Sequence, residues 1–399
     1  MAAARRRPAR LLARALAPAA AILIAVPGCS PAVPEPDPLY AGASATPGSR
    51  TTVSAAASTS PDGAASPDGA ASPGGAAELP DLVHRGDAAT GLGLPWSVVV
   101  LDDGSLLVSD RETGEIERIG DGTTGVVGRI PDAASASGEG GLLGLAVSRT
   151  GPGAGGTDAV YAYYTSAEDN RVVRLPWADG QLGMPEPVLT GIPKAEIHNG
   201  GRIAVGPDGH LYVGTGDAGV RDRAQDPADL GGKILRITAD GGIPGDNPTP
   251  GSPVYSLGHR NVQGLAWDSA GRLWASEFGP EVDDELNLVV PGGNYGWPDV
   301  TGAPGDPRYT DAQVVWPSTA ASSPSGMAIV DDVAYIGGLR GRRLWQVPLA
   351  GGTAGEPAGH FDGHFGRLRD VAAGPGGVLL VATNESGGAR ILRIARDSG

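Results

Sequence analysis

The sequence predicts an all-β fold over residues 79–399, a six-bladed β-propeller built from four-stranded antiparallel blades. From Glu78 to the C-terminus no stretch keeps an apolar period of 3.6 residues. Short β-branched runs recur there instead, each bounded by Gly, Asp, Asn or Pro. The chain also has 65 glycines and 35 prolines, too many turn-forming residues for a helical protein.

Six copies of one hairpin pattern indicate the propeller. Each copy has an apolar strand, a turn and a second strand; the pattern is clearest in 203–213 and recurs in 265–275. The copies begin near residues 98, 145, 203, 265, 327 and 371, about one blade apart. A blade cannot bury both faces alone, so the blades must stack, and a closed ring removes exposed strand edges. A β-sandwich, the alternative fold, does not predict the same hairpin six times.

The N-terminus is typical of a bacterial export signal. In residues 1–29 a basic segment precedes a short apolar one, and the last four residues, Val-Pro-Gly-Cys, resemble a lipobox. Cys29 is the only cysteine, and its position directly after the apolar segment leads us to expect that it is lipidated and anchors a cell-surface or periplasmic lipoprotein in the membrane. Proline is uncommon in a lipobox, and a plain secretory signal or an uncleaved anchor remains the alternative. Residues 30–78, rich in Pro, Ala, Ser and Gly, are expected to form a disordered tether.

The charge of the chain argues against a nucleic-acid partner. The formal net charge is −15, and it becomes −20 without residues 1–29, which hold five arginines and no acidic residue. Binding through phosphate contacts requires a basic surface. Any local group of arginines in so acidic a protein is therefore notable.

Polar residues interrupt the repeat where loops are expected. His198 precedes the strand that begins at 203, and Asp217 follows the second strand of the same hairpin. Two strands and a turn return the chain to the same end of the sheet. A histidine oriented by a carboxylate is a general-base pair. On spacing alone, two residues that each serve a separate turn explain the pattern equally well.

Two other segments have the chemistry of ligand sites. The carbonyls of the Gly279-Pro280 turn are hard oxygen ligands of the kind that Ca²⁺ accepts. The acidic run that follows is either a solvated loop or a second, structural calcium site. Arg367 and Arg369 alternate along a strand and so share one face. A single Arg-x-Arg is usually solvated, but in this acidic chain it suggests a bound polycarboxylate or phosphate.

Taken together, five motifs resemble the glucose/sorbosone dehydrogenase family that depends on pyrroloquinoline quinone (PQQ), particularly its soluble bacterial aldose sugar dehydrogenases. In chain order they are His-Asn-Gly-Gly-Arg with an aspartate nineteen residues on, Gly-His-Arg-Asn-x-Gln-Gly, Phe-Gly-Pro followed by Asp-Asp-Glu-Leu-Asn, Asn-Tyr-Gly-Trp-Pro, and Arg-x-Arg-Asp-Val. The resemblance covers roughly residues 79–396. Five ordered motifs are far more specific than any one of them.

The resemblance implies a sugar dehydrogenase. His198, polarised by Asp217, would remove the proton of the anomeric hydroxyl of an aldose while hydride passes from C1 to PQQ, leaving a lactone. Arg260 would lie beside the carbonyl carbon that accepts the hydride, and Asn261 would also contact the quinone. The electrons would then pass to an external acceptor, because the chain has no haem motif Cys-x-x-Cys-His.

The rest of the cofactor site follows from the same resemblance. The main-chain carbonyls of Gly279 and Pro280 would hold Ca²⁺, and Arg367 and Arg369 would clamp PQQ carboxylates.

Two positions depart from the family pattern. Glu139, which the resemblance implies would contact the cofactor, stands where glucose-type members have Gln. This change recurs in aldose-type relatives and points away from strict glucose specificity. Arg340 stands where members commonly offer Lys to the cofactor, and its planar fork still supplies charge to a carboxylate.

Two other functions remain open. A non-catalytic binding propeller of the same family has no reason to keep His198, Asp217, Arg260, Arg367 and Arg369 together. A metal-dependent lactonase propeller needs several carboxylate or Asn side chains around a central metal, whereas the motifs here are basic and contain histidine.

Overall fold

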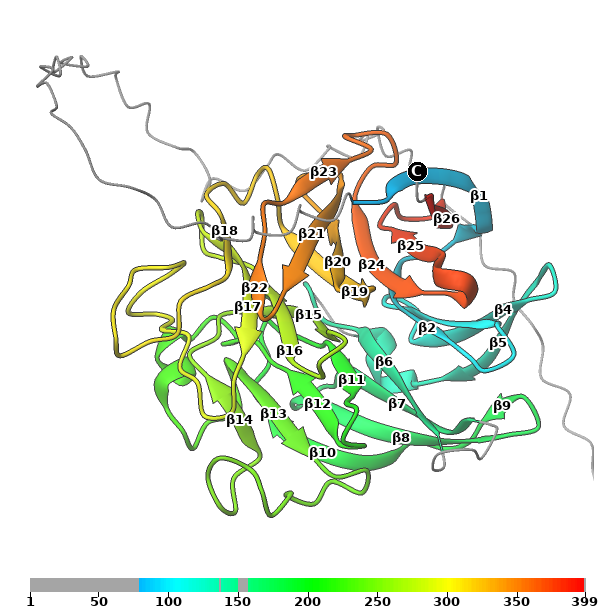
Figure 1. The fold of residues 1–399 in the computed structure, drawn as a ribbon. Helices are drawn as coiled ribbons and strands as arrows, with labels where there is room; N and C mark the ends of the chain where they lie inside the picture. Colours follow the sequence, from blue (N-terminus) through cyan, green and yellow to red (C-terminus); the bar gives the residue numbers. More distant parts are fainter. Residues whose placement is uncertain (1–78, 136–137, 150–156, 398–399) are drawn as a thin grey trace, which may run out of the picture. The chain divides into compact units, whose positions relative to one another are not determined.

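The computed structural model describes residues 79–135, 138–149 and 157–397, which belong to one compact unit. Six antiparallel sheets form the six blades of a propeller (Figure 1), so the fold predicted from the repeats is confirmed. Over the described ranges no α-helix is assigned, and no helical segment is long and apolar enough to span a membrane. The predicted signal, Cys29 and the predicted tether lie outside the described residues.

The blades follow the order of the chain, each beginning with its innermost strand. Blade 1 contains β2 (Pro95–Val100), β3 (Leu106–Asp110), β4 (Glu115–Gly120) and β5 (Thr123–Arg129). Blade 2 contains β6 (Leu142–Arg149), β7 (Thr157–Thr165), β8 (Asn170–Ala178), β9 (Gln181–Leu182) and β10 (Glu186–Ile192). Blade 3 contains β11 (Ile203–Val205), β12 (Leu211–Gly214), β13 (Lys233–Ile237) and β14 (Val254–Leu257).

The second half of the ring repeats this arrangement. Blade 4 contains β15 (Val262–Trp267), β16 (Leu273–Glu277), β17 (Asp284–Val289) and β18 (Val314–Trp316). Blade 5 contains β19 (Pro324–Val330), β20 (Val333–Gly338), β21 (Leu344–Ala350), β22 (Thr353–Ala354) and β23 (Ala358–His360). Blade 6 contains β24 (Leu368–Ala373), β25 (Leu379–Thr383), β26 (Ala389–Asp397) and β1 (Asp81–Leu92). Three short 3₁₀ turns lie between strands: η2 (Pro131–Ser135), η3 (Arg221–Gln225) and η4 (Pro375–Gly377).

Two sheets carry a short fifth strand beyond the four expected. β9 extends the hairpin of β8, and β22 extends that of β21, each across a two-residue turn. The turn residues, Asp179-Gly180 and Gly351-Gly352, all have positive φ, as a tight hairpin turn of the primed type requires.

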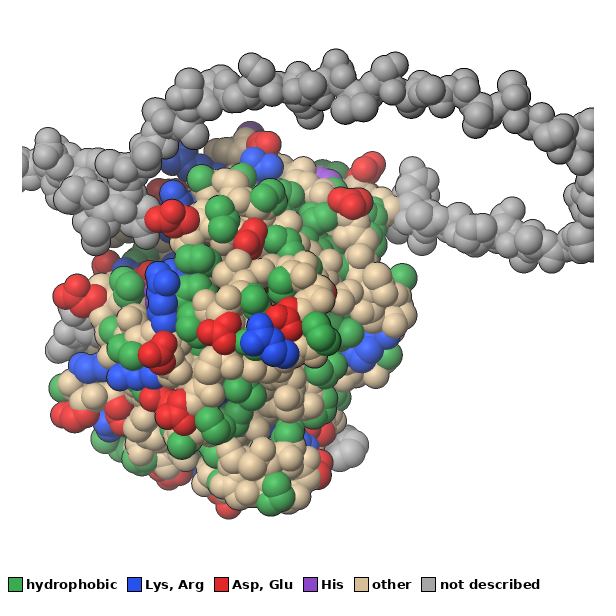
Figure 2. All heavy atoms as spheres, turned by 90° about the vertical axis from the view of Figure 1, so that its left-hand side faces the viewer, with side chains coloured by type: hydrophobic (Ala, Val, Ile, Leu, Met, Phe, Trp, Pro, Cys, Tyr) green, Lys and Arg blue, Asp and Glu red, His purple; other side chains and the backbone are tan. Residues whose placement is uncertain are grey.

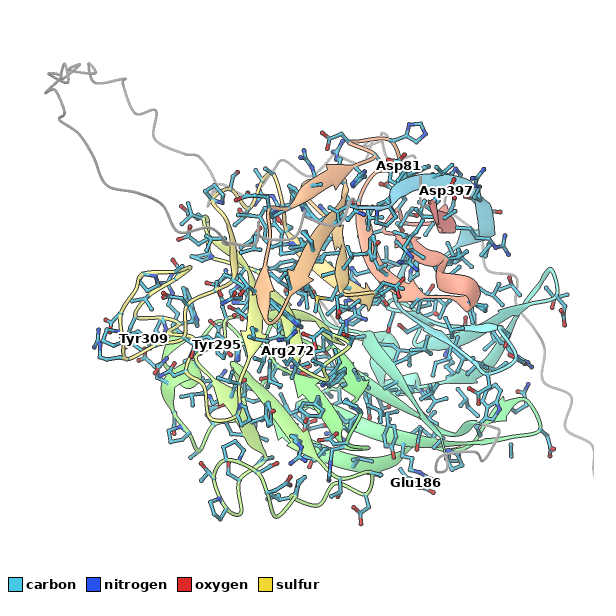
Figure 3. All side chains as sticks on the ribbon, in the orientation of Figure 1. Asp81, Glu186, Arg272, Tyr295, Tyr309 and Asp397 are labelled. Atoms are coloured by element: carbon cyan, nitrogen blue, oxygen red, sulfur yellow. The ribbon has the colours of Figure 1, made fainter. Side chains whose placement is uncertain are left out.

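The ring is closed by strands from opposite ends of the described chain. β1 pairs antiparallel with β26, with a register that runs from Asp81 opposite Asp397 to Leu92 opposite Ala389. Figure 3 labels Asp81 and Asp397 side by side at this junction. Because β1 supplies the outermost strand of blade 6, the last blade is completed only when the first strand docks on it.

Apolar side chains fill the space between neighbouring blades. Between blades 3 and 4, Tyr212 and Ile234 pack against Leu265 and Leu273, all of them buried. Burial of each such side chain stabilises the fold by roughly 1.5–3 kcal/mol. Acidic and basic side chains are interspersed with neutral ones on the face shown in Figure 2.

Every blade presents two loops at one end of the ring. In an antiparallel hairpin, the residues that enter the first strand lie beside those that leave the second, as the pairing of Ile203 with Val213 in blade 3 illustrates. All the predicted site residues fall in, or directly beside, these two kinds of loop. The topology therefore gathers segments from residue 139 to residue 369 at one mouth of the propeller.

Candidate active site

His198 and Asp217 form a hydrogen-bonded pair at this mouth. Nδ1 of His198 lies 2.7 Å from Oδ1 of Asp217. The His198 side chain is 14% exposed and that of Asp217 only 1%, so the imidazole is the member that solvent can reach. With Nδ1 donating to the carboxylate, Nε2 keeps its lone pair, which is the tautomer that a general base needs.

Asp217 is a buried carboxylate with three donors. Besides His198, the backbone N–H of Gly219 donates to Oδ1 at 2.7 Å, and the indole N–H of Trp297 donates to Oδ2 at 2.9 Å. Burial acts to raise the pKa of Asp217, but the hydrogen bonds from His198, Trp297 and Gly219 outweigh it and lower the pKa below its ordinary value. Asp217 is thus held as the anion that orients His198.

Glycines allow the His198 loop to lie against blade 3. A Cβ on Gly216 would sit 1.9 Å from the carbonyl oxygen of His198, and one on Gly200 would sit 2.6 Å from the backbone of Thr215. His198 itself has a φ of 57°, in the left-handed region that is uncommon for residues other than glycine.

Glu139 touches the same loop. Its carboxylate accepts the backbone N–H of His198 at 2.8 Å, while its own N–H donates to the carbonyl of Glu196. The residue predicted to contact the cofactor therefore lies at the site and also braces the backbone of the candidate base.

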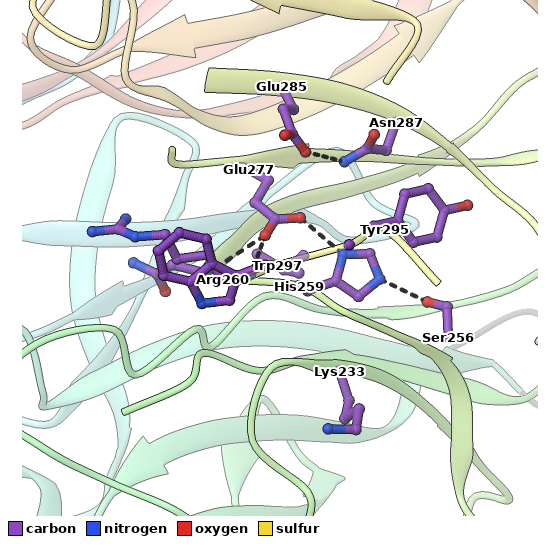
Figure 4. A network of polar contacts seen from close by, with 12 residues as sticks. Lys233, Ser256, His259, Arg260, Glu277, Glu285, Asn287, Tyr295 and Trp297 are labelled. Atoms are coloured by element: carbon purple, nitrogen blue, oxygen red, sulfur yellow. Dashed lines mark hydrogen bonds and ion pairs between the residues drawn. The ribbon is translucent and has the colours of Figure 1, made fainter. Parts of the chain in front are cut away.

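Trp297 connects the His198–Asp217 pair to Arg260. The guanidinium of Arg260 lies over the Trp297 ring, 5.5 Å from its centroid (Figure 4). The same indole donates to Asp217. Trp297 belongs to the motif Asn-Tyr-Gly-Trp-Pro, but the sequence did not predict a role for it. No local signal reveals a contact between residues that lie 80 positions apart.

Arg260 and Asn261 enter blade 4 directly beside His198. The carbonyl of Arg260 accepts the backbone N–H of Asp217 at 2.9 Å. Oδ1 of the buried Asn261 accepts the backbone N–H of Gly200 at 3.0 Å. The segment predicted to contact the quinone is thus hydrogen-bonded to the loops that carry His198 and Asp217.

Arg367 and Arg369 lie in a concentration of positive charge. Burial and then the charges of Arg111 and Arg367 lower the pKa of Arg369, which is 7% exposed. Its hydrogen-bond acceptors are neutral, and no ion pair found over the described residues includes it. Burial lowers the pKa of Arg367 as well, although Glu385 opposes the shift, and Arg342 and Arg340 add to the lowering. Such a cluster would form charge-assisted hydrogen bonds with a bound anion.

Arg340 is exposed at the edge of this cluster, where its Nη1 donates to Oγ1 of Thr319 at 3.3 Å.

The half-buried Gly279-Pro280 turn follows the end of β16 in blade 4, and the N–H of Gly279 donates to Asp284 at 2.9 Å. Burial raises the pKa of Asp284 to about 6. In the part of the chain that the structure describes, no three His, Cys, Asp or Glu side chains are grouped to hold a metal ion.

Comparison with known proteins identifies the class. The family model for glucose/sorbosone dehydrogenases matches residues 92–393, and the chain belongs to this family of oxidoreductases. The family expected from the five ordered motifs is thereby confirmed.

Particular relatives lie within the same class. The PQQ-bound aldose sugar dehydrogenase from Streptomyces coelicolor is similar in structure, with a TM-score of 0.75 and 47% identity over 79% of this chain and 97% of that one. The aldose sugar dehydrogenase YliI of Escherichia coli is 29% identical over 74% of this chain and 88% of its own length. Quinoprotein glucose dehydrogenase B of Acinetobacter calcoaceticus is 34% identical over 56% of this chain and only 54% of its own length.

The hydrogen bond from Trp297 to Asp217 can be tested by stability. Trp297→Phe removes the donor and should destabilise the protein by roughly 1.5–3 kcal/mol at pH 7, because a buried carboxylate loses a partner. Folding lowers the pKa of Asp217. The stability that its carboxylate contributes is therefore complete above the pKa of the unfolded chain, about 3.9, and is lost as the pH falls through the lower pKa of the folded protein. The destabilisation caused by Trp297→Phe should therefore be smaller below about pH 4 than at pH 7, as measured by denaturant unfolding in the two pH ranges.

Trp316→Phe is the matched control. Trp316 is as buried as Trp297, and its indole N–H has no hydrogen-bond partner within the described residues. If both variants lose the same amount of unfolding free energy, and the loss does not depend on pH, the role given to Trp297 is contradicted.

Proposed function

We propose that this protein oxidises an aldose at C1 to its lactone, with His198 as general base and Ca²⁺-bound PQQ as hydride acceptor. One observation carries the proposal: a histidine oriented by a buried carboxylate opens onto the same mouth as the buried Arg369, whose hydrogen-bond acceptors are neutral. The membership of the family supports it.

The arginine cluster fits a polycarboxylate cofactor. Arg367 and Arg369 would bind PQQ carboxylates, and the planar fork of Arg340 would reach another from the rim. The buried Arg369 has only neutral acceptors in Asn384, Gln263 and Ser325. An anion would oppose both the burial and the repulsion between arginines that lower the pKa of Arg369.

The calcium ion would be held chiefly by main-chain oxygens. Over the described residues, no hydrogen bond is found to the carbonyls of Gly279 and Pro280, so their lone pairs are open to a hard cation. When bound, Ca²⁺ and PQQ together supply a polarised carbonyl carbon that accepts hydride.

The residues of the chain handle the proton. Nε2 of His198 would take the proton of the C1 hydroxyl during the two-electron oxidation that makes C1 the lactone carbonyl carbon. Asp217 stabilises the imidazolium that forms, and Glu139 holds the backbone of His198 in place. Arg260 would supply positive charge beside the quinone carbonyl, which would favour the arrival of electrons there. Reoxidation of PQQ would require an external electron acceptor.

The alternatives explain less of the site. A binding propeller needs neither the orientation of His198 nor the arginine cluster. A lactonase needs several metal-binding side chains, and the described ranges contain no such group. The proposal thus rests on a set of residues that a redox reaction uses together.

Reconstitution of the purified protein with PQQ and Ca²⁺ should give aldose-dependent dye reduction. His198→Gln should lower kcat by about 10²-fold or more, since general-base catalysis contributes about 10²–10⁴-fold, while PQQ still binds. The rates are measured over a panel of aldoses, with a sample lacking PQQ as the control. No PQQ-dependent reduction with any sugar would refute the enzyme assignment, and full activity of His198→Gln would refute the base.

We also propose that the protein is exported and anchored through a lipid on Cys29. Cys29→Ser should abolish incorporation of labelled fatty acid and move the protein from the membrane fraction to the soluble fraction. Unchanged labelling and fractionation of this variant would show that Cys29 carries no lipid.

A further inference from the structure

We infer that Glu277, backed by His259 and Ser256, is a positioning group that holds the backbone of Arg260 and Asn261 in the active site. This inference deepens the proposed function and rests on it for its consequence in catalysis. Its structural part concerns contacts of the chain alone.

Glu277 collects three donors at the end of β16. Its Oε1 accepts the backbone N–H of Arg260, and also that of Asn261 at 3.3 Å. Its Oε2 lies 2.8 Å from Nδ1 of His259. Only 3% of Glu277 is exposed, so these donors replace water as its partners (Figure 4). A carboxylate, which only accepts, suits this set of donors.

His259 is fixed on both nitrogens and on one ring face. Nε2 lies 2.8 Å from Oγ of the buried Ser256, and the imidazole stacks on Tyr295 with a centroid distance of 4.6 Å. Since Glu277 can only accept, Nδ1 of a neutral His259 carries the proton and Nε2 accepts from the serine hydroxyl. His259 thereby fixes the carboxylate of Glu277 from behind.

The Ser256–His259–Glu277 chain has the order of a hydrolytic triad but not its accessibility. Ser256 and His259 are both fully buried. No substrate can reach the serine hydroxyl, so the chain acts on the protein backbone and not on a ligand.

The backbone that Glu277 holds is hydrogen-bonded to the other loops of the active site. The Arg260 carbonyl accepts the N–H of Asp217, and the Asn261 side chain accepts that of Gly200, two residues after His198. The Arg260 guanidinium donates from Nη1 to the carbonyl of Phe278 at 3.1 Å. A shift of the Arg260–Asn261 backbone would move the proposed quinone contact and the general-base pair together.

Glu277→Gln tests the contact directly. The amide has one accepting oxygen, and its NH₂ group must face a donor or force His259 into its other tautomer. We expect the amides of Arg260 and Asn261 to exchange hydrogen about tenfold faster in the cofactor-free variant, as measured by exchange with mass spectrometry or NMR. Unchanged exchange at these amides would overturn the inference.

Two further variants keep the test decisive. Glu285→Gln is the matched control: Glu285 is a buried carboxyl opposite Glu277 in the sheet, and the exchange of Arg260 and Asn261 should not change with it. Ser256→Ala leaves Glu277 in place and frees Nε2 of His259, so it should accelerate the same amides by a smaller factor. If Glu277→Gln does not fold, normal protection in Ser256→Ala would contradict the inference.

A double-mutant cycle tests the link to catalysis. With PQQ and Ca²⁺ bound, Glu277→Gln should slow single-turnover reduction of the cofactor by at least about fivefold, but by less than about twofold when Arg260 is already Lys. Additive effects would show that Glu277 does not act through Arg260. If the unsubstituted protein shows no such reduction, the proposed function fails, while the exchange measurement still decides the positioning role.

Discussion

The pairing of β1 with β26 is the constraint on which the rest of the molecule depends. A strand that begins at Asp81 completes a blade whose other strands end at Asp397, so the ring closes only when both ends of the described chain meet. Closure removes the open sheet edges and fixes the six inner strands relative to one another. The mouth of the ring inherits this rigidity, which a site assembled from several blades requires.

Within the ring, one local arrangement recurs at the ends of the second strands. Asp110 in blade 1, Asp217 in blade 3 and Glu277 in blade 4 each lie at or just after the end of such a strand. Asp110 accepts the backbone N–H of Leu94, before the inner strand of its own blade. Glu277 does the same for Arg260, and Asp217 instead receives the His198 ring. The same kind of contact joins two loops of one blade in each case, and in blades 3 and 4 it orients the proposed catalytic groups.

The sequence predicted the fold well because the signals of a blade are local. The six expected starting points all fall within β2, β6, β11, β15, β19 and β24, since each inner strand is marked by its own glycine turn and apolar run. The role of β1 was not predicted, because no local pattern shows which distant edge a strand will join. The short strands β9 and β22 were missed for a related reason, as they depend on the twist of a turn.

The site was predicted in part for the same physical reasons. The topology of one hairpin brings His198 and Asp217 together. Their spacing alone left this pair and two separate turn residues equally good explanations, and the resemblance to the family favoured the pair. Trp297 and Glu277 act through contacts with other loops, so neither was recognised from its neighbours in sequence. The resemblance to the family supplied the roles of Glu139, Arg260, Asn261 and Arg340, because the loops differ from blade to blade.

The orientation of His198 by Asp217 is the central claim, and Asp217→Asn tests it most directly. The asparagine must turn its oxygen toward either His198 or Trp297, so its NH₂ group opposes one of them, and the tautomer that leaves Nε2 free is no longer enforced. We predict that single-turnover reduction of bound PQQ by an aldose slows by about 10²-fold or more, with PQQ affinity unchanged. A rate close to that of the unsubstituted protein, with the fold intact, would contradict the account.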